Sequence, residues 1–236
     1  MSTSEAALAE RVDTIFETRW DVRDGEVVPE TADVALKNGA VKLNAVFLYA
    51  DLAGSSRIAA TCPWGTTAKI IRAYLDVATR LIRAHGGRVR SFDGDRVMGV
   101  FIGDTPNSDA SFCAREIDYS VEKIIGPKAH AAFASVRDNE IEIQHCVGID
   151  VGVVRAVRAG IRNSNDLIWI GKAPSFAAKL SDVRAYPYAV YTSARSYKKL
   201  SAAAKVVGGE DIWEKQSFEF NGEWEDVFRT LKMRQP

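Results

Sequence analysis

The sequence predicts an α/β layer fold, an α+β sandwich in which helices flank a mixed, mostly antiparallel sheet. Segments with apolar residues at period two, typical of strands, alternate with segments whose apolar residues recur at helical spacing. An Asp-Gly pair at residues 93 and 94 separates two apolar runs and indicates a central hairpin. Hydrophobic residues make up 47% of the 236 residues, which is enough for a full core.

The N-terminal region reads as an arm outside the main domain. Residues 4–19 carry apolar side chains near helical spacing, which predicts a helix. Residues 21–29 are polar and read as a connector, and residues 32–43 fit neither period clearly. We expect residues 1–38 to form a helical arm that packs on the core or on a second subunit; a frayed tail is the alternative.

The remaining elements follow from periodicity and from turn residues. Residues 128–138 are compatible with a short helix or a loop, after Gly126-Pro127 ends the preceding helix. Residues 39–202 are predicted to form one domain, and the alternating aromatic runs of residues 203–236 predict a C-terminal extension with a hairpin. The expected strands are 46–51, 140–154, 167–170 and 188–192 with a hairpin at 86–101, and the expected helices run from Thr66 or Thr67 to His85, from Ser108 or Asp109 to Ile125, and over 174–181 and 193–200.

Composition excludes several classes of protein. The chain has 31 basic and 31 acidic residues, and a net charge of zero argues against a nucleic-acid binder. No run of about 18 apolar residues exists, so neither a membrane span nor a membrane partner is expected, and residues 1–20 lack the pattern of a signal peptide. Cys62, Cys113 and Cys146 are widely spaced, which fits free thiols in a cytoplasmic protein.

The stretch from Val46 to Ser56 is the first candidate for a functional site. Strand alternation places Tyr49 and Asp51 on one face, and a carboxylate at the end of an apolar strand is costly unless a charged group meets it. The Gly54-Ser55-Ser56 turn offers backbone N–H groups that suit a phosphate. The simpler interpretation is that Asp51 caps a helix.

The predicted hairpin supplies a second candidate, Asp95. If the two strands lie side by side, a metal ion could join Asp51 and Asp95. Two carboxylates and a glycine-rich turn, without a His/Cys cluster, favour Mg²⁺ or Mn²⁺ with a phosphate substrate. Asp93 is a third carboxylate nearby, although an Asp-Gly turn explains it without any metal.

Four blocks in this sequence resemble the class III nucleotidyl cyclases. They are Tyr-Ala-Asp51-Leu-Ala-Gly-Ser, Gly94-Asp95-Arg-Val-Met-Gly-Val-Phe, Val147-Gly-Ile-Asp-Val-Gly152 and Trp169-Ile-Gly-Lys-Ala-Pro-Ser-Phe-Ala-Ala-Lys-Leu180. They follow the family's order and cover roughly residues 40–200. The resemblance implies that residues 39–202 are a cyclase catalytic domain. It also implies two Mn²⁺ or Mg²⁺ ions per site, held by Asp51, Asp95 and the Leu52 carbonyl, which activate the ribose 3′-hydroxyl and stabilise pyrophosphate.

The sequence departs from the adenine-specific members of that family. The two positions that read adenine carry Ser91 and Ile168 here, so adenine specificity is not expected. Tyr49 could narrow the base pocket, and Arg96, expected across the hairpin from Ser91, could donate to an oxygen-rich base edge. Trp169 could add a stacking wall. The alternatives are a core role for Tyr49 and Trp169 and an exposed edge charge for Arg96.

The helix block departs as well. The family's transition-state asparagine corresponds to Ser175 and its arginine to Lys179. Serine can donate one hydrogen bond to ribose, whereas lysine supplies charge without the bidentate fork. The enzyme therefore either tolerates a less fixed site or has lost part of its catalysis. Arg155, Arg158 and Arg162 could bind phosphates, but a solvated face is the simpler role.

These departures resemble the pyrimidine cyclases of bacterial Pycsar antiphage systems. That resemblance implies synthesis of cUMP or cCMP on infection and a separate effector activated by it. We expect UTP to be favoured over CTP, and a homodimer whose interface holds the active sites. A purine cyclase and an inactive nucleotide-binding module are the alternatives. The predicted substrate-binding residues are Tyr49, Ala53, Gly54, Ser55, Ser91, Arg96 and Ile168.

Overall fold

The computed structural model describes residues 3–236, which divide into two compact units. The first unit contains the chain up to Leu43 together with Val153–Gly171, and the second contains Asn44–Gly152 and Lys172–Pro236. Two long strands, β2 (Gly39–Ala53) and β5 (Gln144–Ile161), contribute to both units. The domain boundaries predicted at residues 38 and 202 stay a prediction.

The second unit is built on a mixed sheet with the strand order β10-β11-β7-β5-β2-β4-β3. The pair β5·β7 is parallel, whereas β2·β4, β3·β4, β7·β11 and β10·β11 are antiparallel. This confirms the mixed, mostly antiparallel sheet. The strands not yet bounded are β3 (Arg88–Asp93), β4 (Arg96–Phe101), β7 (Val190–Ser193), β10 (Glu214–Phe220) and β11 (Glu223–Thr230).

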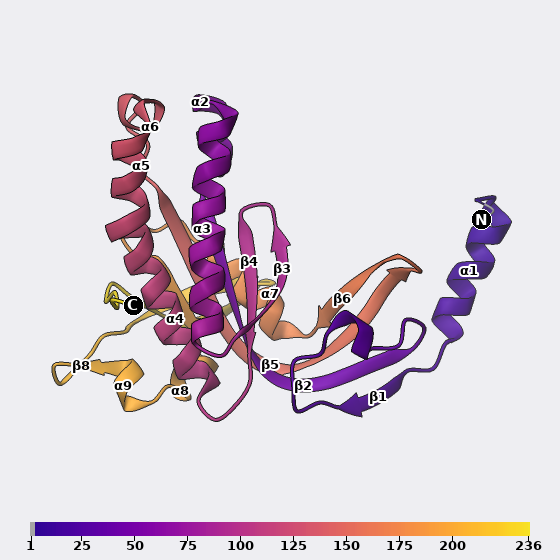
Figure 1. Cartoon of the computed structure of the whole chain (residues 1–236). Helices are drawn as coiled ribbons and strands as arrows, with labels where there is room; N and C mark the ends of the chain where they lie inside the picture. Colours follow the sequence, from indigo (N-terminus) through magenta and orange to yellow (C-terminus); the bar gives the residue numbers. More distant parts are fainter. Residues whose placement is uncertain (1–2) are drawn as a thin grey trace. The chain divides into compact units, whose positions relative to one another are not determined.

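One face of this sheet is covered by α3 (Trp64–Ala84) and α4 (Pro106–Ser120), which lie side by side (Figure 1). Helix α3 begins two to three residues before the predicted cap. Its stripe of Ile70, Tyr74, Ala78 and Ile82 is buried with Val46, Leu48 and Ala50 of β2 in the main core.

Helix α4 continues without a break, contrary to the end predicted at Gly126-Pro127. A π-helical turn, Val121–Ile125, leads into α5 (Gly126–Ala132). Pro127 directly follows the π-helical turn, and this widened turn lets the continuous helix accommodate a residue that has no N–H. Residues 134–138 form the short helix α6 (Ala134–Asp138), one of the two possibilities left open by the sequence.

The opposite face carries α7 (Lys172–Ser181), whose Phe176 and Leu180 bury against Cys146, Tyr191 and Val227. Strand alternation separates the faces: Val147 and Ile149 point to the α3 side, so Cys146 and Gly148 point to α7. Helices therefore cover both faces, as expected for an α+β sandwich. The same alternation puts Tyr49 and Asp51 on the face opposite Leu48 and Ala50.

The first unit adds two strands that the sequence did not predict in full. Strand β1 (Asp21–Asp24) pairs in parallel with the start of β2, so the predicted connector over residues 21–29 was wrong at its beginning. All four β1 residues are exposed, which explains why no alternating apolar pattern marks the strand. Strand β6 (Ser164–Ile170) pairs with the end of β5, Arg155 opposite Ile170 (Figure 1).

Helix α1 (Glu5–Glu17) forms where the sequence predicts one, with Ser4 as its N-cap. No residue of this helix is buried, and its apolar side chains are largely exposed, Phe16 at 81% and Ile15 at 56%. No helix among residues 3–236 is both long and apolar enough to cross a membrane.

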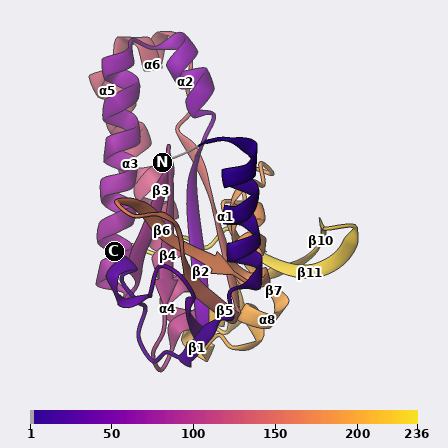
Figure 2. The ribbon, with the colours of Figure 1, turned by 90° about the vertical axis from the view of Figure 1, so that its right-hand side faces the viewer.

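Near the C-terminus, β10 and β11 form the hairpin that the aromatic runs predict, and β11 joins it to β7 (Figure 2). Aromatic contacts fix it to α7, since Phe176 meets Phe218 and Phe220 edge to face.

Several short elements carried too little periodicity to be predicted. They are α9 (Ala202–Lys205), β8 (Val206–Val207), β9 (Glu210–Asp211) and a 3₁₀ turn at Thr31–Asp33. Helix α8 (Ala194–Lys198) lies within a predicted helix, and α2 (Ser55–Thr61) forms at the turn after β2, where a helix was expected to begin.

Candidate active site

The structure places Asp51 and Asp95 at the same end of neighbouring strands. Asp51 pairs with Arg96 across the β2·β4 ladder, and Asp95 directly precedes Arg96 in the β3–β4 turn. The Leu52 N–H donates to the Asp95 carbonyl over 3.4 Å, which joins the end of β2 to that turn. Gly94 adopts φ = 61°, a conformation that favours glycine and lets the turn close in two residues.

Strand register arranges the predicted site residues in two rows on the α7 face. One row is Tyr49, Met98 and Ser91, and the next is Asp51, Arg96 and Asp93. Ser91 is therefore opposite Met98, not opposite Arg96 as the sequence analysis expected. The two-residue Gly94-Asp95 turn sets this pairing, because Asp93 is opposite Arg96 and Ser91, two residues earlier, is therefore opposite Met98.

Asp51 is 6% exposed, and both of its oxygens are paired with arginines. Arg96 Nε lies 3.1 Å from Oδ1, and Arg184 Nη2 lies 2.5 Å from Oδ2. A buried carboxylate is tolerated only when such partners offset its lost hydration. Arg96 also bonds Asp182, whose second oxygen lies 3.5 Å from Lys179 Nζ.

Arg184 is the site residue that the sequence analysis missed. It follows α7 by three residues and falls outside the block that resembles a cyclase motif. Its position becomes evident only because α7 packs on the same face of the sheet that carries Asp51. The one available signal was a basic residue in a short polar segment near a helix end, which is too common to single out.

Two tyrosines close to the aspartates have raised pKa values. Tyr74 is fully buried, and its hydroxyl has no hydrogen-bond partner among residues 3–236. Burial is the main cause that raises the Tyr74 pKa, and the charges of Asp51, Cys146 and Asp95 raise it further. Burial also raises the pKa of Tyr49, against the opposing charge of Arg96.

These residues fit a hard divalent cation. Two carboxylates and the Leu52 carbonyl would give an all-oxygen donor set, which Mg²⁺ and Mn²⁺ prefer. Within residues 3–236 no group of three or more His, Cys, Asp or Glu side chains is placed to hold a metal ion. A backbone oxygen and substrate oxygens would therefore have to complete the coordination.

The turn predicted to bind phosphate leads from β2 into a short helix. Gly54 adopts φ = 67° as the N-cap residue of α2, which begins at Ser55. Ala53 ends β2 beside it. The first N–H groups of a helix lack intrahelical acceptors and can bind an anion.

The remaining predicted residues are not drawn together in the same way. Ser175 and Lys179 lie one turn apart on the exposed side of α7. Ile168 belongs to the first unit, on β6, where it pairs with Val157 and is 44% exposed. Of the three arginines considered for phosphates, Arg158 is held inside the first unit by Asn165 Oδ1 at 2.6 Å.

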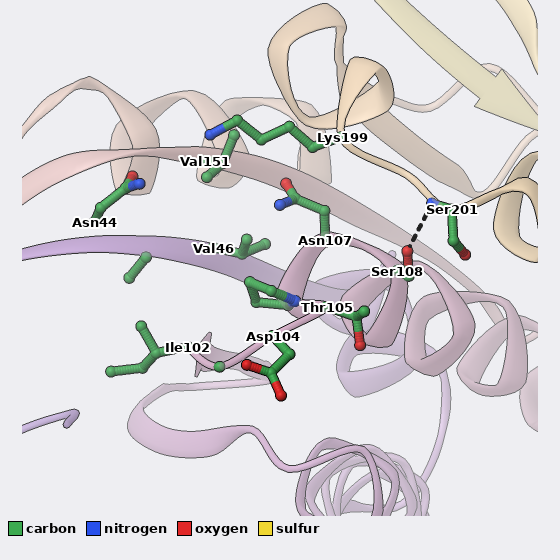
Figure 3. Close-up of a pocket in the computed structure, with 13 residues that line it drawn as sticks. Asn44, Val46, Ile102, Asp104, Thr105, Asn107, Ser108, Val151, Lys199 and Ser201 are labelled. Atoms are coloured by element: carbon green, nitrogen blue, oxygen red, sulfur yellow. Dashed lines mark hydrogen bonds between the residues drawn. The ribbon is translucent and has the colours of Figure 1, made fainter. Parts of the chain in front are cut away.

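A pocket of about 330 Å³ lies elsewhere in the second unit, and none of the predicted site residues lines it. Asn44 and Val46 of β2 border it together with Asn107, Val151 and Lys199 (Figure 3). Asn44 precedes Asp51 by seven residues, which corresponds to roughly 23 Å of strand. This pocket is separate from the two aspartates.

Comparison with known proteins defines the class of this molecule. No family model matches the chain. A bacterial light-regulated adenylyl cyclase matches the structure with a TM-score of 0.69 at 20% identity over 85% of this chain. The chain spans about half of that structure, 54% of its length. The fold is that of a class III nucleotidyl cyclase catalytic domain.

Sequence relatives narrow the class. A uridylate cyclase from Rhodovulum sp. (strain MB263) is 43% identical over 224 residues, which cover 94% of this chain and 93% of the relative. A uridylate cyclase from Burkholderia cepacia is 37% identical over 211 residues, 89% of this chain and 90% of the relative. The chain therefore belongs to the uridylate cyclase family of nucleotidyl cyclases.

Proposed function

We propose that this protein converts UTP into cyclic 3′,5′-UMP and pyrophosphate in a reaction that depends on Mn²⁺ or Mg²⁺. The ribose 3′-oxygen loses its proton and bonds to the α-phosphorus, and the bond from that phosphorus to the β-phosphate bridging oxygen breaks. The observation that carries the proposal is the placement of Asp51 and Asp95 at adjoining strand ends. The relatives named uridylate cyclase support the choice of reaction.

The roles of the residues follow from their positions. Asp51, Asp95 and the Leu52 carbonyl would hold two ions, which supply a lower 3′-hydroxyl pKa and charge compensation for the leaving pyrophosphate. The backbone around Ala53, Gly54 and Ser55 orients the triphosphate through the first N–H groups of α2. Phe47 and Met98 are buried on the same sheet face as Tyr49, so we assign them to the side of the site that is shielded from water.

Base selection is assigned to the row of Tyr49 and Ser91 and to Arg96. Tyr49 occupies volume that a purine would need. Arg96 is a pure donor, and uracil presents two carbonyl acceptors where cytosine presents one carbonyl and one amino donor. If Arg96 faces the 4-position of the base, cytosine is disfavoured by roughly 1–3 kcal/mol. Ile168 occupies the other position at which adenine-specific cyclases read the base, and its apolar side chain cannot make that contact.

The proposal also includes an oligomeric state and a cellular role. We assign the active form to a two-fold homodimer, because one chain carries both the metal aspartates and the pair Ser175 and Lys179. The exposed apolar side chains of α1 offer a surface for the second subunit. The three free, buried cysteines suit the reducing cytoplasm. There the cyclic nucleotide would act as a messenger in antiphage defence and activate a separate effector.

One observation favours a second candidate, an inactive module that binds nucleotide and makes no product. Lys179 and Ser175 replace the residues that the cyclase family uses in its transition state, and Lys179 is paired with Asp182 at 3.5 Å. A purine cyclase with unusual base contacts is the third possibility. The three candidate functions predict a cyclic pyrimidine nucleotide, no product and a cyclic purine nucleotide, respectively.

Competition among the four ribonucleoside triphosphates at equal concentration with Mn²⁺ separates these readings. We expect mainly cUMP by mass spectrometry, with Arg96→Ala losing base preference more than metal affinity. Arg88→Ala, an exposed arginine on the same hairpin, is the matched control and should keep the preference. Mainly cAMP or cGMP would reject the pyrimidine assignment, mainly cCMP would reject only the placement of Arg96, and no product would favour the inactive module.

A further inference from the structure

Arg184 closes the metal site from within the same chain. Its Nη2 bonds Asp51 Oδ2 at 2.5 Å, and its Nη1 donates to the carbonyls of Ser181 at 2.7 Å and Val183 at 3.0 Å. The backbone thus orients one edge of the guanidinium and leaves the other edge on the carboxylate. The side chain is 37% exposed, so Arg184 can also reach outward.

The pairing conflicts with the role proposed for Asp51. A divalent cation on this carboxylate would lie within a few ångströms of both guanidinium groups, and repulsion between the like charges favours the loss of at least one arginine. Arg96 has a second anchor in Asp182, which holds it when Asp51 turns to a metal. Arg184 has carbonyl anchors only, so its positive charge would be left without a carboxylate.

A triphosphate offers the released arginine a better partner. Arginine binds phosphate oxygens through a bidentate fork, which lysine cannot form. Lys179 stands where the cyclase family carries an arginine, but it is 65% exposed and pairs with Asp182. Arg184 lies five residues further on and is the arginine that reaches Asp51.

We propose that Arg184 is an exchangeable counter-ion: it neutralises Asp51 before metal binds, and binds the triphosphate once metal has displaced it. The proposal rests on the proposed function for the role of Asp51 as a metal ligand. It predicts that metal and triphosphate binding are coupled through one side chain, since each favours the same position of Arg184.

The test measures binding without turnover. Mn²⁺ is titrated into nucleotide-free protein and followed by the paramagnetic resonance signal of free Mn²⁺, and inorganic tripolyphosphate is then titrated into the Mn²⁺-loaded protein by calorimetry. Arg184→Ala should bind Mn²⁺ at least about 5-fold more tightly, because its competitor is gone, and bind tripolyphosphate at least about 5-fold more weakly. A merely structural residue would weaken both.

Two further variants keep the test decisive. Arg80→Ala removes a surface arginine paired with Asp76 at 2.7 Å on α3 and should leave both affinities unchanged. Arg184→Lys keeps the charge and loses the fork, so it should hold Mn²⁺ affinity near that of the unaltered protein and weaken tripolyphosphate binding. Arg184→Lys provides the test if Arg184→Ala fails to fold.

The outcomes that overturn the proposal are distinct from a failure of the proposed function. Unchanged or weaker Mn²⁺ binding by Arg184→Ala overturns the exchange. Tighter Mn²⁺ binding with unchanged tripolyphosphate binding overturns the phosphate role. If the unaltered protein cyclises no nucleotide and the two affinities still move in opposite directions, the proposed function fails and Arg184 keeps its assignment.

Discussion

Gly148 determines at the scale of one residue how closely α7 approaches the sheet. A Cβ atom built on Gly148 would lie 2.1 Å from the Ala177 carbonyl oxygen and 2.6 Å from the Ser181 backbone nitrogen. Both contacts are with helix backbone, which cannot rotate away as a side chain could. Asp182 and Arg184 follow this helix directly, so the position of the arginine on Asp51 depends on the approach.

We therefore expect Gly148→Ala to lower the free energy of unfolding by about 1–3 kcal/mol or more. The measurement is a urea unfolding curve, read at constant slope. Gly65→Ala in α3 is the matched control, since no atom lies within 4 Å of its added Cβ and alanine favours a helix. Equal stability of the two variants would show that α7 can shift without cost.

Single residues also show where sequence reasoning stopped. Asp51 and Asp95 could be predicted because a carboxylate at a strand end and an Asp-Gly hairpin leave local signals. The contact of Arg184 with Asp51 could not, because it joins the segment after α7 to the end of β2, far away in the sequence. The partner of Ser91, in contrast, could have been counted from the sequence, because a two-residue turn that pairs Asp93 with Arg96 also pairs Ser91 with Met98.

At the scale of elements, periodic segments were predictable and short or polar ones were not. The 21-residue helix α3 and the β3–β4 hairpin have strong apolar patterns, and both form close to where the sequence indicates. Strand β1 has four exposed residues, of which only Val22 is apolar, and α9 has only four residues. Such segments are stabilised by their neighbours, so their own composition does not reveal them.

The end predicted at Gly126-Pro127 failed through a misreading of proline. Proline disrupts a regular α-helix because its ring clashes with the carbonyl four residues before it, but a π-helical turn just before the proline changes that spacing. Here the π-helical turn Val121–Ile125 absorbs the irregularity, and α5 starts at Gly126.

At the scale of the whole molecule, the chain alone presents Ser175 and Lys179 on an exposed helix side. A homodimer with active sites in its interface would bring these residues of one subunit to the aspartates of the other. Mixing inactive Asp51→Ala with inactive Lys179→Ala protein should then restore part of the activity, because one of the two sites in each heterodimer is intact.

The complementation experiment needs proof that subunits exchange, for example by mass spectrometry of differently tagged chains. Activity that rises with the heterodimer fraction supports shared sites. Exchange without any rescue would count against them and would place all catalytic groups within one subunit.

The most direct test of the central claim compares UTP cyclisation by the unaltered protein with that of Asp51→Ala and Asp95→Ala. With Mn²⁺ and UTP, the unaltered protein should release cUMP and pyrophosphate in equal amounts, and chelation of the metal should stop the reaction. Each substitution should lower the rate at least ~10²-fold while the circular dichroism spectrum is kept, since the ions supply several kcal/mol of charge stabilisation. Near-normal cUMP formation by Asp95→Ala with Mn²⁺ would contradict the account.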